Sequence, residues 1–70
     1  MDKKFRLQII RREDDVVEET MFARSILEIE ELVDNYFYTN GELNLRNIKY
    51  YYKIAQLNDD GEYVVYQGDV

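Results

Sequence analysis

The chain has 70 residues with no cysteine, histidine, proline or tryptophan, and its 15 acids and 9 bases give a net charge of -6. This length allows one domain with a small core, and the composition excludes disulfides, thiolate metal sites and the commonest zinc ligand. Because small domains without such cross-links are commonly stabilised by a partner subunit, we expect a single domain over residues 1–70 that forms a homodimer.

The composition also argues against disorder and against a membrane location. Hydrophobic residues make up 46% of the chain and aromatic residues 14%, whereas disordered chains are poor in aromatics. The longest uncharged run, residues 35–41, has seven residues, and a membrane-spanning helix needs about 20 apolar ones. Residues 1–6 lack the apolar core of a signal peptide. We therefore expect a cytoplasmic protein.

Charge is distributed in blocks along the chain. Residues 1–12 carry five bases and one acid, whereas residues 13–34 carry nine acids and one base. Residues 35–53 carry three bases and one acid, and residues 54–70 carry four acids and no base. The folded chain should therefore present separate acidic and basic surfaces.

The first segment, residues 4–12, alternates between apolar and polar side chains. Phe5, Leu7 and Ile9 fall on one side of an extended chain. The other side carries Lys4, Arg6, Gln8, Ile10 and Arg12. A period of two predicts a strand that is buried on one face.

The next segment fits a helical period, because apolar residues recur at spacings of three and four. The apolar stripe consists of Phe22, Ile26, Ile29, Val33, Tyr36 and Phe37. Asp15 is expected to cap the helix, with Glu18 three residues later, and Asn40-Gly41 is expected to end it. The spacing predicts one long helix over residues 16–38, with Ser25 as a small packing residue beside the stripe.

Residues 45–57 fit both periods. A helical stripe would use Leu45, Ile48, Tyr52 and Ala55, and a strand would use Ile48, Tyr50, Tyr52 and Ile54. Three consecutive tyrosines favour the strand. The following Asn58-Asp59-Asp60-Gly61 fits a type I turn with Gly61 in a bulge. The sequence therefore predicts a hairpin of residues 46–57 with residues 62–68, with Leu43 and Leu45 as an extended lead-in.

These elements follow the order β-α-β-β. The order predicts an α+β domain in which one long helix packs on one face of a three-stranded sheet. The other face must then meet water or a partner.

Residue types suited to catalysis are scarce. The aliphatic hydroxyls belong to Ser25, Thr20 and Thr39. Activation of such a nucleophile needs a neighbouring base, and the chain has no histidine. Residues 58–62 do not have the alternating ligands and the glycine of a calcium loop. We predict a non-enzymatic protein that binds no metal and no cofactor.

Two surfaces are candidate binding sites. The first is an acidic helix face with two apolar anchors, formed by Leu27, Glu31, Asp34 and Tyr38. The second is a basic sheet face with a tyrosine, formed by Arg6, Lys49, Tyr51 and Lys53. The basic face resembles, in kind, the platforms that bind single-stranded nucleic acid, although the net acidity of the chain opposes phosphate binding. An ordinary solvated surface is the alternative for each.

The size, acidity and lack of catalytic residue types resemble the small accessory proteins of phages and mobile elements. We expect an acidic interaction protein, homodimeric, whose helix face binds a basic protein surface. One alternative is an acidic decoy that inhibits a nucleic-acid-binding enzyme or regulator. Another is single-stranded nucleic-acid binding through the basic sheet face.

Overall fold

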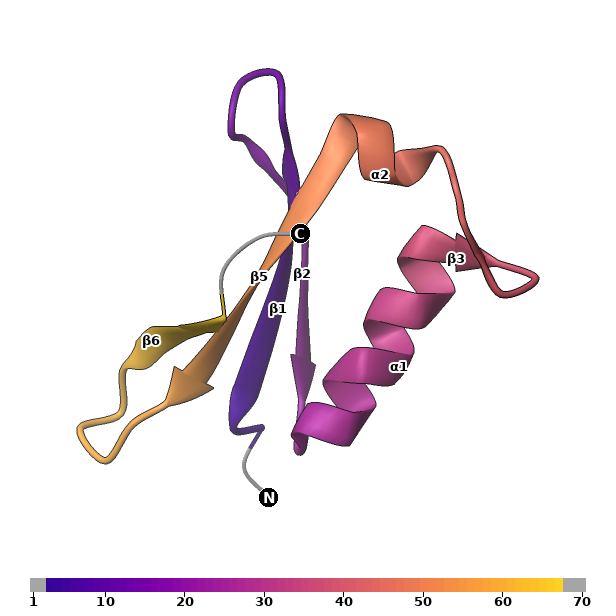
Figure 1. Cartoon of the computed structure of the whole chain (residues 1–70). Helices are drawn as coiled ribbons and strands as arrows, with labels where there is room; N and C mark the ends of the chain where they lie inside the picture. Colours follow the sequence, from indigo (N-terminus) through magenta and orange to yellow (C-terminus); the bar gives the residue numbers. More distant parts are fainter. Residues whose placement is uncertain (1–2, 68–70) are drawn as a thin grey trace.

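A computed structural model describes residues 3–67, with side chains described through residue 65. The larger strands are β1 (Phe5–Arg11), β2 (Val17–Ala23), β5 (Tyr50–Leu57) and β6 (Tyr63–Gln67). The remaining elements are α1 (Ile26–Phe37), the two-residue strands β3 (Tyr38–Thr39) and β4 (Glu42–Leu43), and α2 (Arg46–Lys49). The four larger strands form an antiparallel sheet in the order β2-β1-β5-β6 (Figure 1). The expected α+β class is confirmed.

The predicted helix over residues 16–38 is wrong in its first third, where Val17–Ala23 form β2, paired with β1. Asp15 lies in the hairpin turn and has a left-handed backbone with φ 58°, so it does not cap a helix. Its N–H donates to the carbonyl of Arg11 at 2.8 Å. The Arg11 guanidinium also binds the carboxylates of Asp14 and Glu18, which fixes the turn and the start of β2. The sheet therefore has four strands and not the three expected.

The helix begins at a different cap from the one expected. Ser25 is exposed and its hydroxyl accepts the N–H of Glu28 at 3.2 Å. The Glu28 carboxylate in turn accepts the N–H of Arg24 at 2.9 Å. This reciprocal arrangement satisfies N–H groups that have no partner within the helix. Ser25 is thus a capping residue and not the packing residue expected, and α1 has 12 residues.

The end of the helix is also earlier than expected. Tyr38 has an extended backbone and starts the small hairpin of β3 with β4. Asn40 and Gly41 form its turn with φ of 53° and 81°. Two positive φ values in succession are typical of the tight hairpin turn that Asn-Gly favours.

The second predicted hairpin is confirmed for Tyr50–Leu57 and Tyr63–Gln67, and residue 68 lies outside the described residues. Gly61 has φ 83°, and its N–H donates to the Asn58 carbonyl at 3.1 Å. Residues 46–49, predicted as strand, form α2 instead. The Asn44 side chain accepts the Arg46 N–H at 2.9 Å just before this short helix. Of the expected extended lead-in, Leu43 lies in β4, whereas Leu45 immediately precedes α2.

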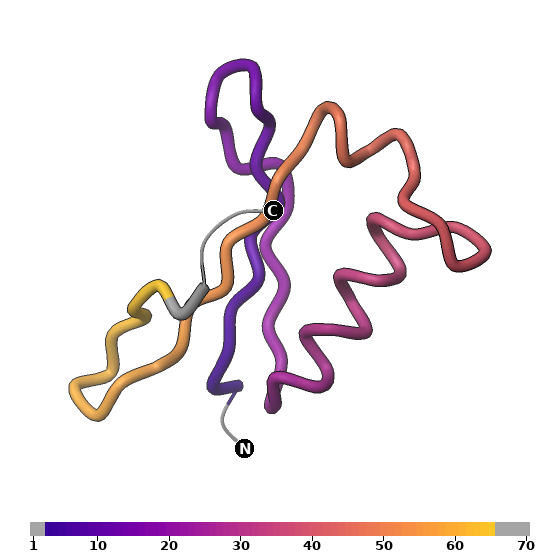
Figure 2. Tube along the Cα trace, viewed as in Figure 1, coloured from indigo at the N-terminus to yellow at the C-terminus, as the bar shows by residue number. Residues whose placement is uncertain are grey.

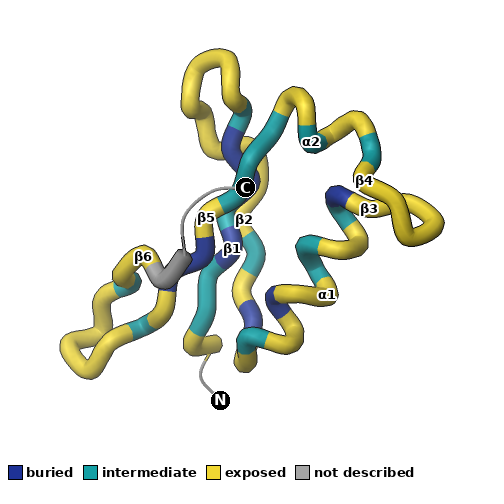
Figure 3. The backbone as a smooth tube through the Cα atoms, viewed as in Figure 1, coloured by how far each residue is buried: buried dark blue, intermediate teal, exposed yellow. Residues whose placement is uncertain are grey.

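The core lies between α1 and one face of the sheet, as the alternation in β1 predicted (Figure 3). Its buried residues are Leu7, Ile9, Ala23, Ile29, Phe37 and Ile54. The stripe residues from Ile26 to Phe37 pack toward this core. Phe22 does not, because it pairs with Arg6 on the opposite face of the sheet, where its side chain is 45% exposed. No helix within residues 3–67 has the length and apolarity needed to cross a bilayer.

The helix covers only part of this face. Its backbone packs against β1 and β2, and the hairpin of β5 and β6 extends away on the far side of β1 (Figure 2). Side chains of α1 still reach β5, since the rings of Phe37 and Tyr52 have centroids 5.6 Å apart. A groove therefore runs along the side of α1, between this helix and β5.

Candidate functional site

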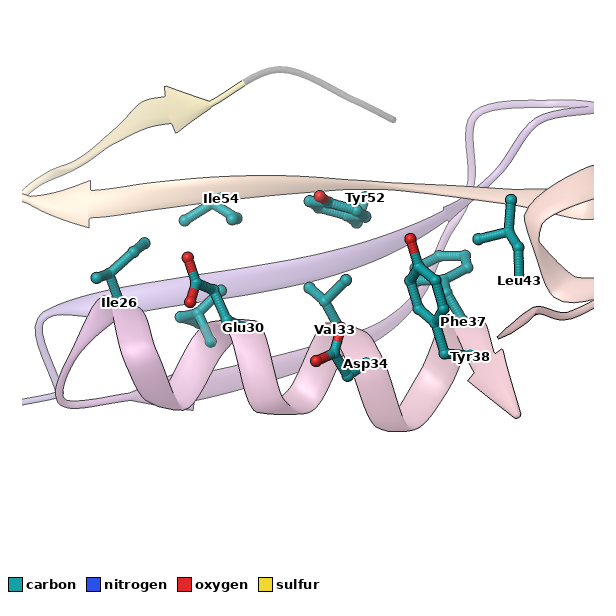
Figure 4. Close-up of a pocket in the computed structure, with 10 residues that line it drawn as sticks. Ile26, Glu30, Val33, Asp34, Phe37, Tyr38, Leu43, Tyr52 and Ile54 are labelled. Carbon is teal, nitrogen blue, oxygen red and sulfur yellow. The ribbon is translucent and has the colours of Figure 1, made fainter. Parts of the chain in front are cut away.

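The groove between α1 and β5 has a mainly apolar lining (Figure 4). The helix contributes Ile26, Ile29, Val33 and Phe37, and β5 contributes Tyr52 and Ile54. Tyr38 and Leu43, from β3 and β4, close the end beyond the helix. Its volume is about 200 Å³. Because an apolar cavity of about 150 Å³ accommodates benzene, the groove has room for one bulky apolar side chain.

Two carboxylates, those of Glu30 and Asp34, stand on the helical rim of the groove. They are one helical turn apart, so their charges repel each other. No base occurs in α1. Within the described residues, the ion pairs that the structure contains join Arg11 to Asp14 and Glu18, and neither rim carboxylate takes part in one. The rim is therefore an uncompensated negative site beside an apolar surface.

The rim charges act on the phenol of Tyr52 in the groove floor. Partial burial raises the pKa of Tyr52 above its ordinary value, and the negative charges of Tyr38, Asp34 and Glu30 raise it further. Burial disfavours any charge in the groove, and the carboxylates of Asp34 and Glu30 disfavour a further negative one. The rim carboxylates thus oppose an anionic ligand and favour a base that stays at the exposed rim, while the buried floor favours an apolar group.

The structure divides the predicted acidic face. Asp34 and Tyr38 line the groove, whereas Leu27 and Glu31 do not. Leu27 is 64% exposed on the helix, outside the groove. Glu30, which was not among the predicted site residues, joins Asp34 on the rim. The signal that identifies it is a carboxylate pair at i and i+4 directly beside the apolar stripe.

The predicted basic face is brought together only in part. Arg6, Tyr51 and Lys53 alternate with the core residues of β1 and β5, so they lie on the sheet face opposite α1. Lys49 does not lie on this face, because it belongs to α2 and borders a separate hollow with Arg11 and Arg12. The expectation that all four residues share a strand face is therefore wrong.

Side chains on the basic face also have partners within the chain. The Arg6 guanidinium lies 5.0 Å from the centroid of the Tyr63 ring. The Tyr51 hydroxyl donates to Asp15 at 2.9 Å, and the Arg12 guanidinium lies 5.5 Å from the centroid of the Tyr51 ring. Lys53 is exposed. The cation-aromatic pairs that suggested a nucleic-acid platform are thus engaged in intramolecular contacts.

The hydroxyl side chains considered as nucleophiles, and the residues compared with a calcium loop, form hydrogen bonds that stabilise the fold. Ser25 caps α1, and the Thr39 hydroxyl accepts the Asn44 amide at 3.2 Å. Asn58 accepts the N–H groups of Asp60 and Glu62, both at 2.9 Å, which makes it the centre of the β5–β6 turn. Over residues 3–67, carboxylates do not gather in a group of three or more that is suited to a metal ion.

Comparisons of this chain with protein-family models, with curated proteins and with solved structures found no match. The groove and the two charged surfaces are therefore the basis for a functional assignment.

Proposed function

We propose that this chain is a non-enzymatic binding protein that holds a basic surface of another protein against α1 and the adjacent groove. The observation that carries the proposal is the placement of Glu30 and Asp34 on the rim of an apolar groove, on a helix that has no base. Uncompensated carboxylates beside apolar surface match a partner that presents bases around an apolar side chain.

The apolar residues supply affinity and the carboxylates supply orientation. Leu43 is 49% exposed and Tyr38 is 42% exposed, and both border the groove. Aromatic and apolar anchors near the centre of an interface carry most of its binding energy. Charges at the rim mainly raise the association rate and suppress partners of like charge.

A basic protein surface fits these features better than free nucleic acid does. The net charge of -6 repels phosphates at long range. On the basic face, Arg6 and Tyr51 already contact Tyr63 and Asp15 within the chain. If the basic surface of the partner normally binds nucleic acid, the acidic rim would cover that surface. The chain would then inhibit nucleic-acid binding by the partner as a decoy.

The test is quantitative affinity capture from the source cell, read by mass spectrometry, with charge-reversed variants. Glu30→Lys/Asp34→Lys reverses the rim and should abolish capture of the specific partner. Asp59→Lys/Asp60→Lys makes the same charge change at exposed positions in the β5–β6 turn and should leave capture intact. Both variants are first checked for wild-type melting. Undiminished capture by the rim variant would exclude the proposal.

A second arm addresses nucleic acid directly. The purified chain is titrated with a labelled single-stranded oligonucleotide of about 20 nucleotides at several salt concentrations. We expect no binding at physiological salt. Binding that weakens steeply with salt and disappears in Lys53→Glu would assign the function to the basic sheet face instead.

A further inference from the structure

The sheet offers room for a second helix beside α1. A helix with its side chains is about 10–12 Å wide, and adjacent strands are about 4.8 Å apart, so one helix covers about two strands. The helix α1 packs on β1 and β2, and the order β2-β1-β5-β6 leaves β5 and β6 beside it. The backbone of α1 therefore leaves β6 and the outer side of β5 without a helix above them, although α1 side chains reach Tyr52 and pack with Ile54.

The groove continues along β5 toward β6, where side chains become more exposed. Tyr52, Ile54 and Gln56 of β5 point to the side of the sheet on which α1 lies, because they alternate with residues of the opposite face. Val64 of β6 pairs with Gln56 on the same side and is 53% exposed. The apolar groups that a partner can reach on this side are therefore the half-buried Tyr52 and the exposed Val64, with the exposed, polar Gln56 beside Val64.

We propose that an amphipathic, basic helix of the partner protein lies in this space, parallel or antiparallel to α1, and completes the helical layer. The inference rests on the proposed function and names the chemistry of the partner. The apolar stripe of the incoming helix packs on Leu43, Tyr52 and Val64, of which Leu43 and Val64 are 49% and 53% exposed. One large apolar side chain enters the groove, and bases on the flank nearest α1 pair with Glu30 and Asp34.

The backbone of the sheet favours a helix over an extended segment at this place. The backbone of β5 is paired with β1 on one side and with β6 on the other. The groove floor therefore presents side chains and no ladder for an added strand. A helix satisfies its own backbone groups and recognises a groove through side chains at i, i+3, i+4 and i+7.

The charge of the rim excludes a second copy of α1 as the occupant. In such a dimer Glu30 and Asp34 would face carboxylates of the same acidic helix, and α1 has no base to separate them. Like charges in contact at an interface oppose association. The other helix of the described residues, α2, carries two bases but has four residues and cannot fill a space as long as α1. A longer helix with basic flanks meets the opposite situation, so a helix of another protein fits the space.

The test uses three synthetic helical peptides of about 14 residues, which is four turns. The first has a leucine stripe and lysine flanks, the second replaces lysine with glutamate, and the third scatters the leucines and lysines of the first without a stripe. Each is titrated into the ¹⁵N-labelled full chain by NMR, and circular dichroism reports whether the bound peptide is helical.

We expect the first peptide to bind as a helix and to shift the amides of Val33, Tyr52, Ile54 and Val64. The other two should bind at least about tenfold more weakly. Leu43→Lys places a base in the groove and should weaken binding about tenfold. Leu45→Lys is the matched control, because Leu45 is 80% exposed and does not line the groove, and it should bind as wild type does.

Several results would overturn the helical occupant. These are equal binding by the scattered peptide, equal affinity of the two leucine variants, amide shifts confined to the opposite sheet face, an extended bound peptide, or no binding at all. If capture of the native partner is nevertheless lost in Glu30→Lys/Asp34→Lys, the proposed function stands without the helix. If the peptide binds in the groove but the rim variant captures the native partner normally, the proposed function is the statement that fails.

Discussion

The rings of Phe22 and Tyr63 have centroids 5.9 Å apart, although the two residues belong to β2 and β6, the opposite edges of the sheet. The outer strands of a flat four-stranded sheet would be about 14 Å apart. Both side chains therefore lean across the face opposite α1, over the inner strands β1 and β5. Ile10 and Ala55 on this face are 4% and 2% exposed. The face that was expected to need a partner is partly covered by the chain's own side chains.

This aromatic cover predicts the first stability difference. Tyr63 contacts Phe22 and Arg6, and its hydroxyl donates to the carbonyl of Lys3 at 2.8 Å. Tyr63→Ala should lower the free energy of unfolding by about 2 kcal/mol, since it removes an aromatic pair and a cation-π contact. Tyr63→Phe keeps the ring and should cost about 1 kcal/mol or less. Equal losses in urea denaturation would mean that the ring contacts contribute nothing.

The cap of α1 predicts a second difference in stability. Ser25→Ala removes the acceptor for the Glu28 N–H and should lower the free energy of unfolding by about 1 kcal/mol. Ser25→Asp keeps an acceptor at the same place and should remain close to wild type. Chemical denaturation of the three proteins measures this, and an alanine variant as stable as the aspartate variant would contradict the cap.

Burial along the helix predicts a large contrast between two nearby positions. Ile29 is fully buried, whereas Leu27 is 64% exposed. Ile29→Asp buries an unpaired carboxylate and should unfold the domain, because the penalty of several kcal/mol matches the stability of so small a core. Leu27→Asp should change the melting temperature little. Circular dichroism melts compare the two, and a folded Ile29→Asp would show that the helix is packed through another face.

The sequence predicts those elements whose local pattern has one interpretation. The alternation of Phe5, Leu7 and Ile9 and the turn at Gly61 gave the correct strand and hairpin. Residues 17–23 satisfy two patterns, because glutamate, methionine and alanine favour a helix while Met21 and Ala23 also keep a period of two. Pairing with β1 decides in favour of the strand, and that is a tertiary effect. The local sequence does contain a signal for the actual start of the helix, because Ser25 followed three residues later by Glu28 is typical of a helix cap.

The groove is less predictable than the elements around it. The groove exists because α1 covers some strands and not others. The strand order β2-β1-β5-β6, which determines this, cannot be predicted from a local sequence pattern. The acidic helix face was predicted from charge, and Asp34 and Tyr38 do border the groove. The prediction placed Tyr38 on the helix, whereas the chain turns at this residue and brings its ring to the end of the groove.

The ionisation of Tyr52 predicts an alkaline effect. Burial, aided by the charges of Tyr38, Asp34 and Glu30, raises the pKa of Tyr52, so the folded state holds this proton more tightly than the unfolded state does. The resulting stability is complete below the ordinary tyrosine pKa of about 10 and is lost as the pH rises through the raised value.

A ¹³C NMR titration of the tyrosine Cζ atoms measures this pKa, with Tyr52→Phe used to assign the signal. In Glu30→Gln/Asp34→Asn the pKa should fall toward its ordinary value while staying above it, since burial is the larger cause. An unchanged pKa would show that the rim charges do not reach the groove floor.

The homodimer stays a prediction, and β6 is the strand that favours it. This edge strand exposes Val64 and Val65 by 53% and 57%, and an apolar edge invites pairing with another strand. Sedimentation equilibrium at about 100 µM should give twice the chain mass. Val65→Lys should shift the equilibrium toward monomer, whereas Val17→Lys on the other edge should not. A wild-type monomer that unfolds cooperatively would exclude the dimer.

The pairing of β1 with β5 determines how the chain reaches its native state. The β1–β2 hairpin with α1 and the β5–β6 hairpin are each built from near neighbours in sequence. Arg11 and Tyr50, by contrast, are 39 positions apart, and Phe5 and Gln56 are 51 apart. Folding rates fall as such distant contacts come to dominate. Formation of the β1–β5 pairing is therefore expected to be the slow step, and lengthening the Asn40-Gly41 turn should slow it only slightly, by about 0.6 kcal/mol of barrier for each doubling of the connecting loop.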